Sequence, residues 1–209
     1  MNSSSEAKIV VVGAIEVGKT SISNRYVRNE FVSETNATIG ASYLMKNVTI
    51  GDNSVLLKLW DTAGQERFKT MGSLYFRQIN SVILVFDLSS PTSLEAIPGW
   101  YNEVKKYNLG STYSIFLVGN KSDLQQKVSD EAIKEISKSI GAKYFTTSAK
   151  NGQGIDELFV NVAMSVIRNI SPNTNSSIPK PPPSSMNSNT NNQSNEEQRE
   201  SKACCCSIY

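Results

Sequence analysis

The sequence contains no histidine, and its only cysteines are three consecutive residues, Cys204, Cys205 and Cys206. Adjacent cysteines cannot join distant segments of a fold by disulfide bonds, so we expect a reduced, cytosolic compartment. The lack of histidine excludes acid–base chemistry on imidazole and metal sites built from histidine. No apolar run reaches the roughly 18 residues that a membrane-spanning helix needs. A formal net charge of +2 without a basic cluster argues against nucleic acid as a partner.

The composition changes along the chain, which predicts one folded domain followed by a tether. Residues 1–170 hold all 12 glycines and both tryptophans. Residues 171–203 are mostly Ser, Asn, Pro and charged residues, so we expect a disordered linker that cannot offset its ordering entropy. Residues 204–209 form the cysteine-containing end. The N-terminus lacks the basic and apolar regions of a signal peptide, and Asn2 stands where myristoylation requires glycine.

Apolar periodicity predicts an α/β domain. The turn Gly51-Asp52-Asn53 joins two strand-like runs, which indicates an antiparallel hairpin. The other strands alternate with helices, so we expect right-handed crossovers and a mostly parallel sheet covered on both faces. Ligands bind such sheets at the carboxyl ends of the strands. We expect strands at residues 8–12, 43–51, 55–60, 82–87, 114–119 and 143–146, and helices at 18–28, 92–107, 129–139 and 154–169, with a shorter irregular helical pattern after Gln65.

A phosphate-binding loop of the pattern G-x-x-x-x-G-K-[ST] follows the first expected strand. Its glycines let backbone N–H groups converge on phosphate oxygens, and the next helix adds the partial positive charge of its N-terminus. Lys19 can reach the terminal phosphates, and the Thr20 hydroxyl can ligate Mg²⁺. A chance glycine-rich turn, the alternative, rarely has Lys-Thr on its far side. The loop consists of Gly13, Ala14, Ile15, Glu16, Val17, Gly18, Lys19 and Thr20.

Two further segments supply candidates for the phosphate end of a nucleoside triphosphate. Asp61, at a strand end, is placed to hold Mg²⁺ through a water. Gly64 allows a backbone N–H to approach the γ-phosphate, and Gln65 is the candidate catalytic residue, which would orient the attacking water. In the long polar loop before the second strand, Thr38 can complete the Mg²⁺ coordination and Phe31 can stack edge-on against a base. The alternatives are an ordinary turn at residues 61–64 and a core role for Phe31.

A base-reading site is expected after the fifth and sixth strands. Asp123 can accept hydrogen bonds from the ring N–H and the exocyclic amine of guanine, a donor pair that adenine lacks. Asn120 can bond to the ring edge, and the alkyl stem of Lys121 can cover the base face. Ordinary turns rich in Asn and Asp are the alternative. A backbone N–H for the guanine carbonyl is expected from the tripeptide Ser148, Ala149 and Lys150.

Together the segments GAIEVGKT, Thr38, WDTAGQERF, NKSD and SAK resemble those of the small GTPases of the Ras superfamily, across residues 7–170. Residues 39–43, 57–68 and 75–77 look like the Rab versions of these segments. The Ile-Gly-Ala-Ser-aromatic sequence at 39–43 looks most like the Rab branch of early endosomes. The resemblance implies a P-loop NTPase G domain with six strands, one of them antiparallel, and helices on both faces. It also implies Mg²⁺ binding and cycling between GTP and GDP, with hydrolysis of GTP to GDP and phosphate.

The resemblance further implies an exchange factor, a GTPase-activating protein, effector proteins and an escort protein or dissociation inhibitor. We expect them to act on a monomer. Tyr43, Trp60 and Tyr75 match an exposed aromatic cluster of Rab proteins, although core packing is an alternative for part of Trp60. The implied effector residues are Thr35, Asn36, Ala37, Ile39, Gly40, Ala41, Ser42, Tyr43, Trp60 and Tyr75.

The last six residues resemble the double-cysteine endings that Rab proteins present for geranylgeranylation. We expect lipids on Cys205 and Cys206, because two chains give stable anchoring and no polybasic run precedes them; the third cysteine, Cys204, leaves the choice of pair open. Residues 206–209 also fit a C-a-a-X box, but a terminal Tyr209 is not among its usual specificities. The expected location is the cytoplasmic face of intracellular membranes, at endosomes or the plasma membrane, with a soluble cytosolic pool.

Three residues depart from the family pattern. Ile15 replaces a small glycine of Ras proteins near the γ-phosphate, which predicts slow intrinsic hydrolysis that an activating protein can still accelerate. Glu16 beside a polyphosphate predicts weaker nucleotide binding and faster exchange, unless its side chain points to solvent. Gln78 stands where Rab proteins commonly have glycine, and is expected to alter effector choice. Three functions stay open: a cycling GTPase of vesicle traffic, a hydrolysis-impaired GTP-bound interaction module on membranes, and a P-loop ATPase or nucleotide kinase.

Overall fold

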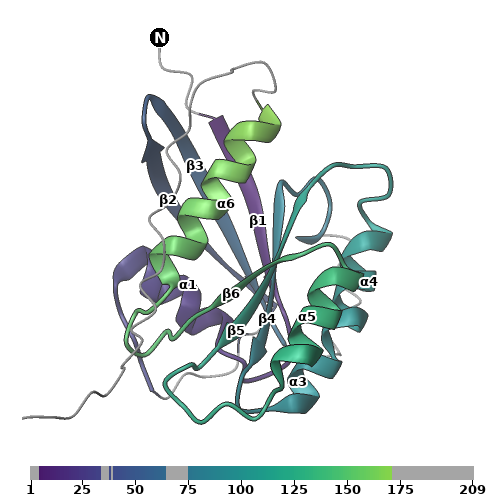
Figure 1. The fold of residues 1–209 in the computed structure, drawn as a ribbon. Helices are drawn as coiled ribbons and strands as arrows, with labels where there is room; N and C mark the ends of the chain where they lie inside the picture. The colour runs from purple at the N-terminus through teal and green to yellow at the C-terminus, as the bar shows by residue number, and fades with distance from the viewer. Residues whose placement is uncertain (1–4, 34–37, 39, 65–74, 171–209) are drawn as a thin grey trace, which may run out of the picture. The chain divides into compact units, whose positions relative to one another are not determined.

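The computed structural model describes residues 5–33, 38, 40–64 and 75–170. Within this part of the chain, six strands form one sheet in the order β2-β3-β1-β4-β5-β6 (Figure 1). The β2–β3 pair is antiparallel, and the other four pairs are parallel. The predicted mixed sheet with one antiparallel strand is therefore confirmed. The strands are β1 (Ser5–Val12), β2 (Ala41–Ile50), β3 (Asn53–Thr62), β4 (Ser81–Asp87), β5 (Ser114–Asn120) and β6 (Lys143–Thr146).

The strand sequences follow their positions in the sheet. β4 reads SVILVFD and is buried at every residue, because it lies near the centre of the sheet with helices on both faces. β2 is an edge strand, and exposed residues alternate with half-buried residues along most of its length. The candidate residues lie at or just after the carboxyl ends of β1, β3, β4, β5 and β6, so the chain places them along one edge of the sheet.

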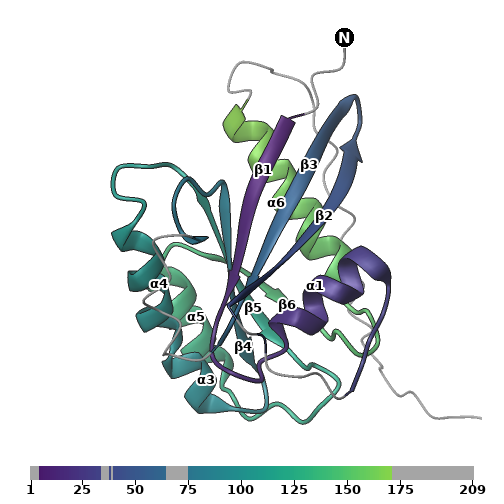
Figure 2. The same ribbon diagram turned by 180° about the vertical axis from the view of Figure 1, so that it is seen from behind.

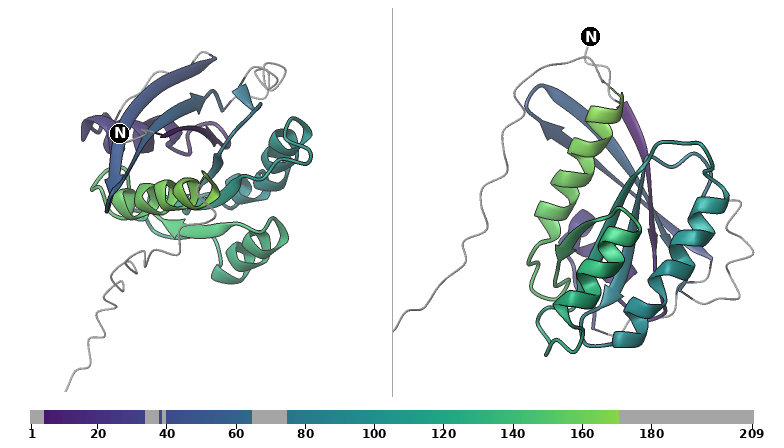
Figure 3. Two further views of the ribbon diagram at one scale, coloured as in Figure 1. Left: turned by 90° about the horizontal axis from the view of Figure 1, so that it is seen from above. Right: turned by 45° about the vertical axis from the view of Figure 1, so that its right-hand side comes forward.

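The described helices cover both faces of the sheet (Figures 2 and 3). Each face has its own core of buried side chains. On one face α1 and α6 pack on the sheet, with Ile22 and Phe159 among the buried side chains. On the other face α3, α4 and α5 pack on β1, β4 and β5 around Phe86 and Trp100. The predicted two-faced coverage is thus confirmed. The helices are α1 (Lys19–Arg28), α3 (Pro91–Glu95), α4 (Ile97–Lys106), α5 (Asp130–Ser139) and α6 (Ile155–Ile170).

One expected helix is wrong as a single element. The pattern at residues 92–107 forms two short helices, α3 and α4, that meet at Ala96. Pro98 has no N–H to donate to the carbonyl of Leu94, so the helical ladder is interrupted there. The irregular pattern after Gln65 falls on residues 65–74, outside the described residues. None of the helices in the described ranges is both long enough and apolar enough to cross a bilayer.

Candidate functional site

The loop between β1 and α1 has backbone geometry that only glycine adopts without strain at two positions. Gly13 has φ 148°, and a Cβ there would lie 2.1 Å from the carbonyl oxygen of Val85 on β4. Gly18 has φ 91°, and a Cβ there would lie 2.3 Å from Nδ2 of Asn120. The two glycines therefore let the loop curl tightly against β4 and the end of β5.

The Lys19 side chain folds back over this loop. Its ammonium group donates to the carbonyl oxygens of Gly13 (3.1 Å) and Ala14 (2.7 Å). Only 6% of the residue is exposed, and this burial lowers the pKa of Lys19 to about 8 against the opposing effect of Asp61. A Cβ at Gly64 would lie 2.5 Å from the Lys19 nitrogen, so the start of the segment after β3 touches the same place. The loop thus holds one cation where the phosphates of a nucleotide would lie.

Three oxygen-bearing side chains from distant segments meet beside Lys19. The Thr20 hydroxyl donates to Oδ2 of Asp61 at 2.6 Å and lies 3.0 Å from the hydroxyl of Thr38. Oδ1 of Asp61 is buried and has no hydrogen-bond partner among the described residues. Burial raises the pKa of Asp61 to about 6, although the Thr20 hydrogen bond and Lys19 oppose the rise. Hard oxygen donors with one unsatisfied carboxylate oxygen fit the chemistry of Mg²⁺.

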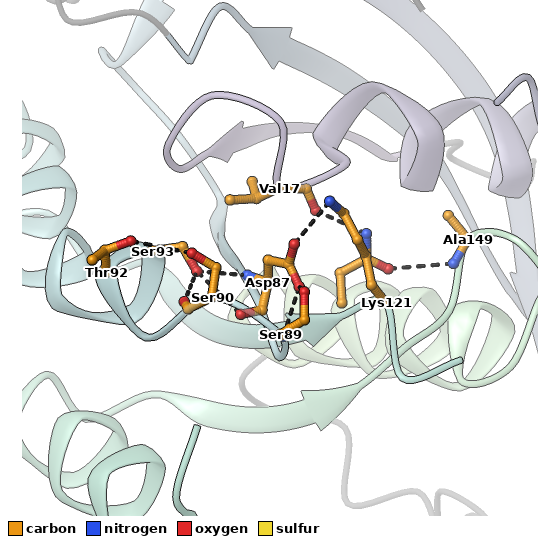
Figure 4. Close-up of polar contacts among 9 residues, drawn as sticks. Val17, Asp87, Ser89, Ser90, Thr92, Ser93, Lys121 and Ala149 are labelled. Atoms are coloured by element: carbon orange, nitrogen blue, oxygen red, sulfur yellow. Dashed lines mark hydrogen bonds and ion pairs between the residues drawn. The ribbon is translucent and has the colours of Figure 1, made fainter. Parts of the chain in front are cut away.

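Asn120 connects the phosphate loop with the loop after β6 by bonding to Val17 and Ala149, the two partners labelled in Figure 4. Its Nδ2 donates to the carbonyl of Val17 at 2.9 Å, and its Oδ1 accepts from the backbone N–H of Ala149 at 3.3 Å. The hydroxyl of Thr147 donates to the same Oδ1 at 3.2 Å. The side chain is almost completely buried. Its polar atoms therefore bond to protein atoms of two loops, a linking role that sequence reasoning missed.

Asp123 and Ser148 also meet at this end of the sheet. The Ser148 hydroxyl donates to Oδ1 of Asp123 at 2.5 Å, and the Lys150 ammonium lies 3.9 Å from Oδ2. The two expected base-reading segments are therefore neighbours. Phe31 is 38% exposed, so the alternative of a buried core residue is wrong.

Asp87 is a member of this site that sequence reasoning missed. Its Oδ2 forms a 2.8 Å ion pair with the Lys121 ammonium, and its Oδ1 accepts from the backbone N–H and hydroxyl of Ser89 (Figure 4). Burial raises the pKa of Asp87, but the hydrogen bonds and charge of Lys121 and the bonds of Ser89 outweigh it, and the pKa lies below its ordinary value. Its position as the last residue of β4 was the available signal. The ion pair thereby holds the Lys121 ammonium group at the end of β4.

Three aromatic rings form a cluster that we call the aromatic surface: Tyr43 of β2, Trp60 of β3 and Tyr75. The Tyr43 and Trp60 ring centroids are 5.1 Å apart, and those of Trp60 and Tyr75 are 5.8 Å apart. Tyr43 is 43% exposed, whereas Trp60 and Tyr75 are half-buried against the core on the α4 face. The cluster is thus partly exposed and partly packed.

The remaining candidates divide into placed and unplaced residues. Ile15 is 50% exposed. Glu16 is also exposed, with φ 63°. The expected weakening of nucleotide binding by Glu16 depended on its side chain not pointing to solvent, so we expect its effect to be small. The carbonyl of Gly40 accepts from the N–H of Ala63 at 2.8 Å, and Ala41 and Ser42 begin β2 opposite Thr62 and Asp61. Seven predicted site residues lie outside the described residues: Thr35, Asn36, Ala37, Ile39, Gln65, Cys205 and Cys206.

A phosphate-binding loop and an oxygen cluster at the carboxyl ends of a mixed α/β sheet define a P-loop nucleotide-binding domain. The Ras family matches residues 8–168. The Ras-related protein Rab-21 of Bos taurus is 41% identical over 162 residues, 77% of this chain and 72% of the relative. RabJ of Dictyostelium discoideum is 38% identical over 168 residues (79% and 65%), and the Ypt/Rab-type GTPase YPT7 of Saccharomyces cerevisiae is 36% identical over 177 residues (81% and 85%).

The chain therefore belongs to the Ras family of small GTPases, in its Rab branch. It binds guanine nucleotide and hydrolyses GTP to GDP and phosphate, and it acts in vesicle traffic with regulators and effectors at membranes. The predictions of a Rab small GTPase and of a GTPase activity are confirmed. The alternative of an ATPase or nucleotide kinase is excluded.

Proposed function

We propose that this Rab protein is a γ-phosphate-dependent switch that directs endosomal membrane traffic. The observation that carries the proposal is the meeting of Thr20, Thr38 and Asp61, in which one hydroxyl lies 2.6 Å from the carboxylate and 3.0 Å from the second hydroxyl. Thr38 belongs to the loop before β2, and Asp61 lies three residues before Gly64. A ligand held by these residues would therefore connect two segments that a terminal phosphate can order.

At the phosphate end, the loop of residues 13–20 would hold the phosphates with its N–H groups and Lys19. Mg²⁺, held by Thr20, Thr38 and by Asp61 through a water, would neutralise charge on the β- and γ-phosphate oxygens. Gln65 would orient the attacking water. The water oxygen then bonds to the γ-phosphorus as the bond to the β–γ bridging oxygen breaks, which gives GDP and phosphate. Lys19 remains positively charged near neutral pH, since burial lowers its pKa only to about 8.

At the base end, Asp123 would accept from the ring N–H and exocyclic amine of guanine. The hydrogen bond from the Ser148 hydroxyl, at 2.5 Å, already orients the Asp123 carboxylate, which supports this role for Asp123. Lys121 would cover one face of the base and Phe31 would approach its edge, while the N–H of Ala149 is a donor for the guanine carbonyl. Asn120 and Lys150 would complete the site.

The effector surface is proposed to be the aromatic surface together with the segment that precedes it, which is ordered when GTP is bound. Exposed aromatic anchors such as Tyr43 are typical of binding hot spots. Exchange factors, GTPase-activating proteins, effectors and an escort protein or dissociation inhibitor are the proposed partners of a monomer. Besides Tyr43, Trp60 and Tyr75, the proposed effector residues are Thr35, Asn36, Ala37, Ile39, Gly40, Ala41 and Ser42.

Membrane attachment is proposed to come from geranylgeranyl groups on Cys205 and Cys206, at the end of a linker of residues 171–203. Two lipid chains give stable anchoring, whereas one is marginal. The endosome is the proposed membrane, because the Ile-Gly-Ala-Ser-aromatic sequence at residues 39–43 resembles that of early-endosomal Rab proteins.

The Thr20→Ala variant tests the switch. We expect Mg²⁺-dependent retention of GTP and GDP to fall by about tenfold or more, because a metal-directed hydroxyl is lost. Thr92→Ala, which changes an exposed threonine at α3, is the matched control and should retain nucleotide as the natural chain does. Nucleotide release is measured with and without a chelator.

Amide hydrogen exchange of the natural chain loaded with GDP or a non-hydrolysable GTP analogue completes the test. We expect protection in the triphosphate form at residues 35–43 and 64–79. Identical exchange in both forms, or equal competition by ATP and GTP for the site, would overturn the proposed switch.

A further inference from the structure

Lys8, on β1, contacts both sides of the aromatic surface although it is remote from the nucleotide site. Its ammonium group lies 5.2 Å from the centroid of the Trp60 ring. The same group donates to the carbonyl oxygen of Arg77 at 2.9 Å. Trp60 is on β3, next to β1 in the sheet (Figure 2), and Arg77 lies two residues after Tyr75. One cation therefore links a strand of the aromatic surface to the turn that carries its third ring.

The backbone of Lys8 is paired with the same turn. Its N–H donates to Oδ1 of Asn80 at 2.8 Å, and its carbonyl accepts from the N–H of Asn80 at 2.9 Å. Between the two anchored residues, Gln78 has φ 54°, in the left-handed region that disfavours a side chain. A strained residue persists only where its surroundings hold it, and Lys8 bonds to the chain on both sides of Gln78.

The charge of Lys8 is not neutralised by a carboxylate in the described part of the chain. Its neighbour across the strand pair is Lys58, and the nearby Glu6 carboxylate forms its ion pair with that residue. Burial lowers the pKa of Lys8, so its ammonium group is partly stripped of water. A partly desolvated cation interacts more strongly with an aromatic face and with a carbonyl than an exposed one does.

We propose that Lys8 is a positioning residue for partner recognition: its ammonium group holds the Trp60 ring and the turn of Tyr75 in one fixed arrangement. The inference rests on the proposed effector role of the aromatic surface. The partner it serves is a protein that packs apolar side chains against this preformed surface. Without the cation, Trp60 and Tyr75 would sample several relative positions, and binding would have to order them.

The first test uses the tryptophan fluorescence of Trp60. The chain has two tryptophans, so Trp100→Phe leaves Trp60 as the only tryptophan, and excitation selective for tryptophan avoids the tyrosines. In this background we expect Lys8→Met to shift the emission and to increase acrylamide quenching about twofold, since a contact that orders the ring is lost. Lys8→Arg, which keeps a cation and N–H donors, should restore the natural signal. Lys58→Met removes a charge from the register neighbour and should leave Trp60 unchanged.

The second test uses trypsin cleavage after Arg77 in the natural tryptophan background. We expect Lys8→Met to raise the rate at which a new N-terminus appears at Gln78 by about threefold to tenfold, because an anchor of this turn is lost. Lys8→Gln keeps a donor for the carbonyl but no charge. It should therefore show the altered Trp60 signal with cleavage close to that of the natural chain. Lys58→Met again serves as the control.

Nucleotide retention separates this inference from the proposed function. All Lys8 variants should retain GDP and GTP as the natural chain does, whereas failure of the natural chain to bind guanine nucleotide would overturn the proposed function alone. The positioning role would be overturned if Lys8→Met had the trypsin cleavage rate and Trp60 fluorescence of the natural chain. It would also be overturned if Lys58→Met changed both signals as much as Lys8→Met does. Should Lys8→Met fail to fold, the fluorescence of Lys8→Gln tests the positioning role in its place, and a natural Trp60 signal in that variant would overturn it.

Discussion

At the scale of single residues, Ile15 is the difference from the Ras family pattern that has the most direct consequence for GTP hydrolysis. Ile15 is half exposed and follows Ala14. Ala14 lies against Gly64, because a Cβ added at Gly64 would be 2.6 Å from the Ala14 carbonyl oxygen. Gln65 is the next residue after Gly64. A branched side chain beside Ala14 is therefore close to the start of the segment from which Gln65, the proposed catalytic residue, would orient a water, without being part of the core.

We predict that Ile15→Gly raises the single-turnover rate of GTP hydrolysis about tenfold, which corresponds to about 1.4 kcal/mol of barrier. The reason is that the crowding side chain is removed while the loop backbone stays. Phosphate release from GTP-loaded protein measures the rate. Ile15→Val keeps the branch and should hydrolyse GTP at the natural rate. Equal rates for Ile15→Gly and the natural chain would refute the crowding argument.

Gln78 offers a test of backbone strain at the same scale. A non-glycine residue at φ 54° costs about 1–2 kcal/mol, and glycine removes that cost but adds about 0.5–1 kcal/mol of unfolded-state entropy. We predict that Gln78→Gly raises the free energy of unfolding by about 0.5 kcal/mol. Urea unfolding at a fixed excess of GDP measures it. Arg77→Gly, next to it, has no positive φ to relieve and should destabilise the fold; stabilisation by both variants would contradict the strain argument.

At the scale of secondary structure, β2 is held to α1 and α6 by a stack of side chains. The Lys46 ammonium of β2 lies 4.0 Å from the centroid of the Tyr26 ring and donates to the Tyr26 carbonyl at 2.6 Å. Tyr26 in turn stacks on Phe159 of α6 with ring centroids 3.7 Å apart. The edge strand that follows the loop of Thr38 is thereby tied to two helices on one face of the sheet.

We predict that Lys46→Met lowers the free energy of unfolding by about 1–2 kcal/mol, because a charged hydrogen bond and a cation–π contact are lost. Chemical denaturation at a fixed excess of GDP is the measurement. Lys105→Met is the matched control, since that exposed lysine lies 5.8 Å from the Tyr101 ring and bonds to no carbonyl among the described residues. We expect its effect to stay within about 0.5 kcal/mol. If Lys105→Met lowered the free energy of unfolding as much as Lys46→Met does, the contacts of Lys46 with Tyr26 would not be the source of the stabilisation.

Elements were easier to predict from the sequence than contacts. The apolar runs of β1 and β4 and the turn at Gly51 carry local signals, so the strands were expected within a few residues of their bounds. The prediction of one helix at residues 92–107 followed the apolar spacing alone and did not use Pro98, the local signal for the break between α3 and α4. Motif spacing also placed Asp61 and Asp123 at strand ends. The Asp87–Lys121 and Lys8–Trp60 contacts join distant segments, and no local pattern encodes which side chains meet there.

At the scale of the whole molecule, function requires a folded domain and a membrane attachment that act together. The described chain ends with α6 at Ile170, and 39 residues follow it. The sequence of those residues has as many acidic as basic side chains, with Lys180, Arg199 and Lys202 against three glutamates. Attraction to anionic lipids is therefore too weak to replace covalent lipids, which supports the proposed attachment through the cysteines.

We predict that Cys205→Ser/Cys206→Ser moves the protein from membranes to the cytosol, because loss of both proposed lipid chains would remove the apolar area that anchors it. Fractionation and imaging of the tagged full chain in cells measure the distribution. Each single variant should leave a weakly and reversibly bound fraction, since one lipid gives marginal binding. Cys204→Ser should remain on membranes if the pair is Cys205 and Cys206. Release of Cys204→Ser from membranes, with Cys205→Ser still bound to them, would assign the lipids to Cys204 and Cys206 instead. The proposed nucleotide switch would be unaffected, because we expect binding of GDP and GTP to depend on the folded domain alone.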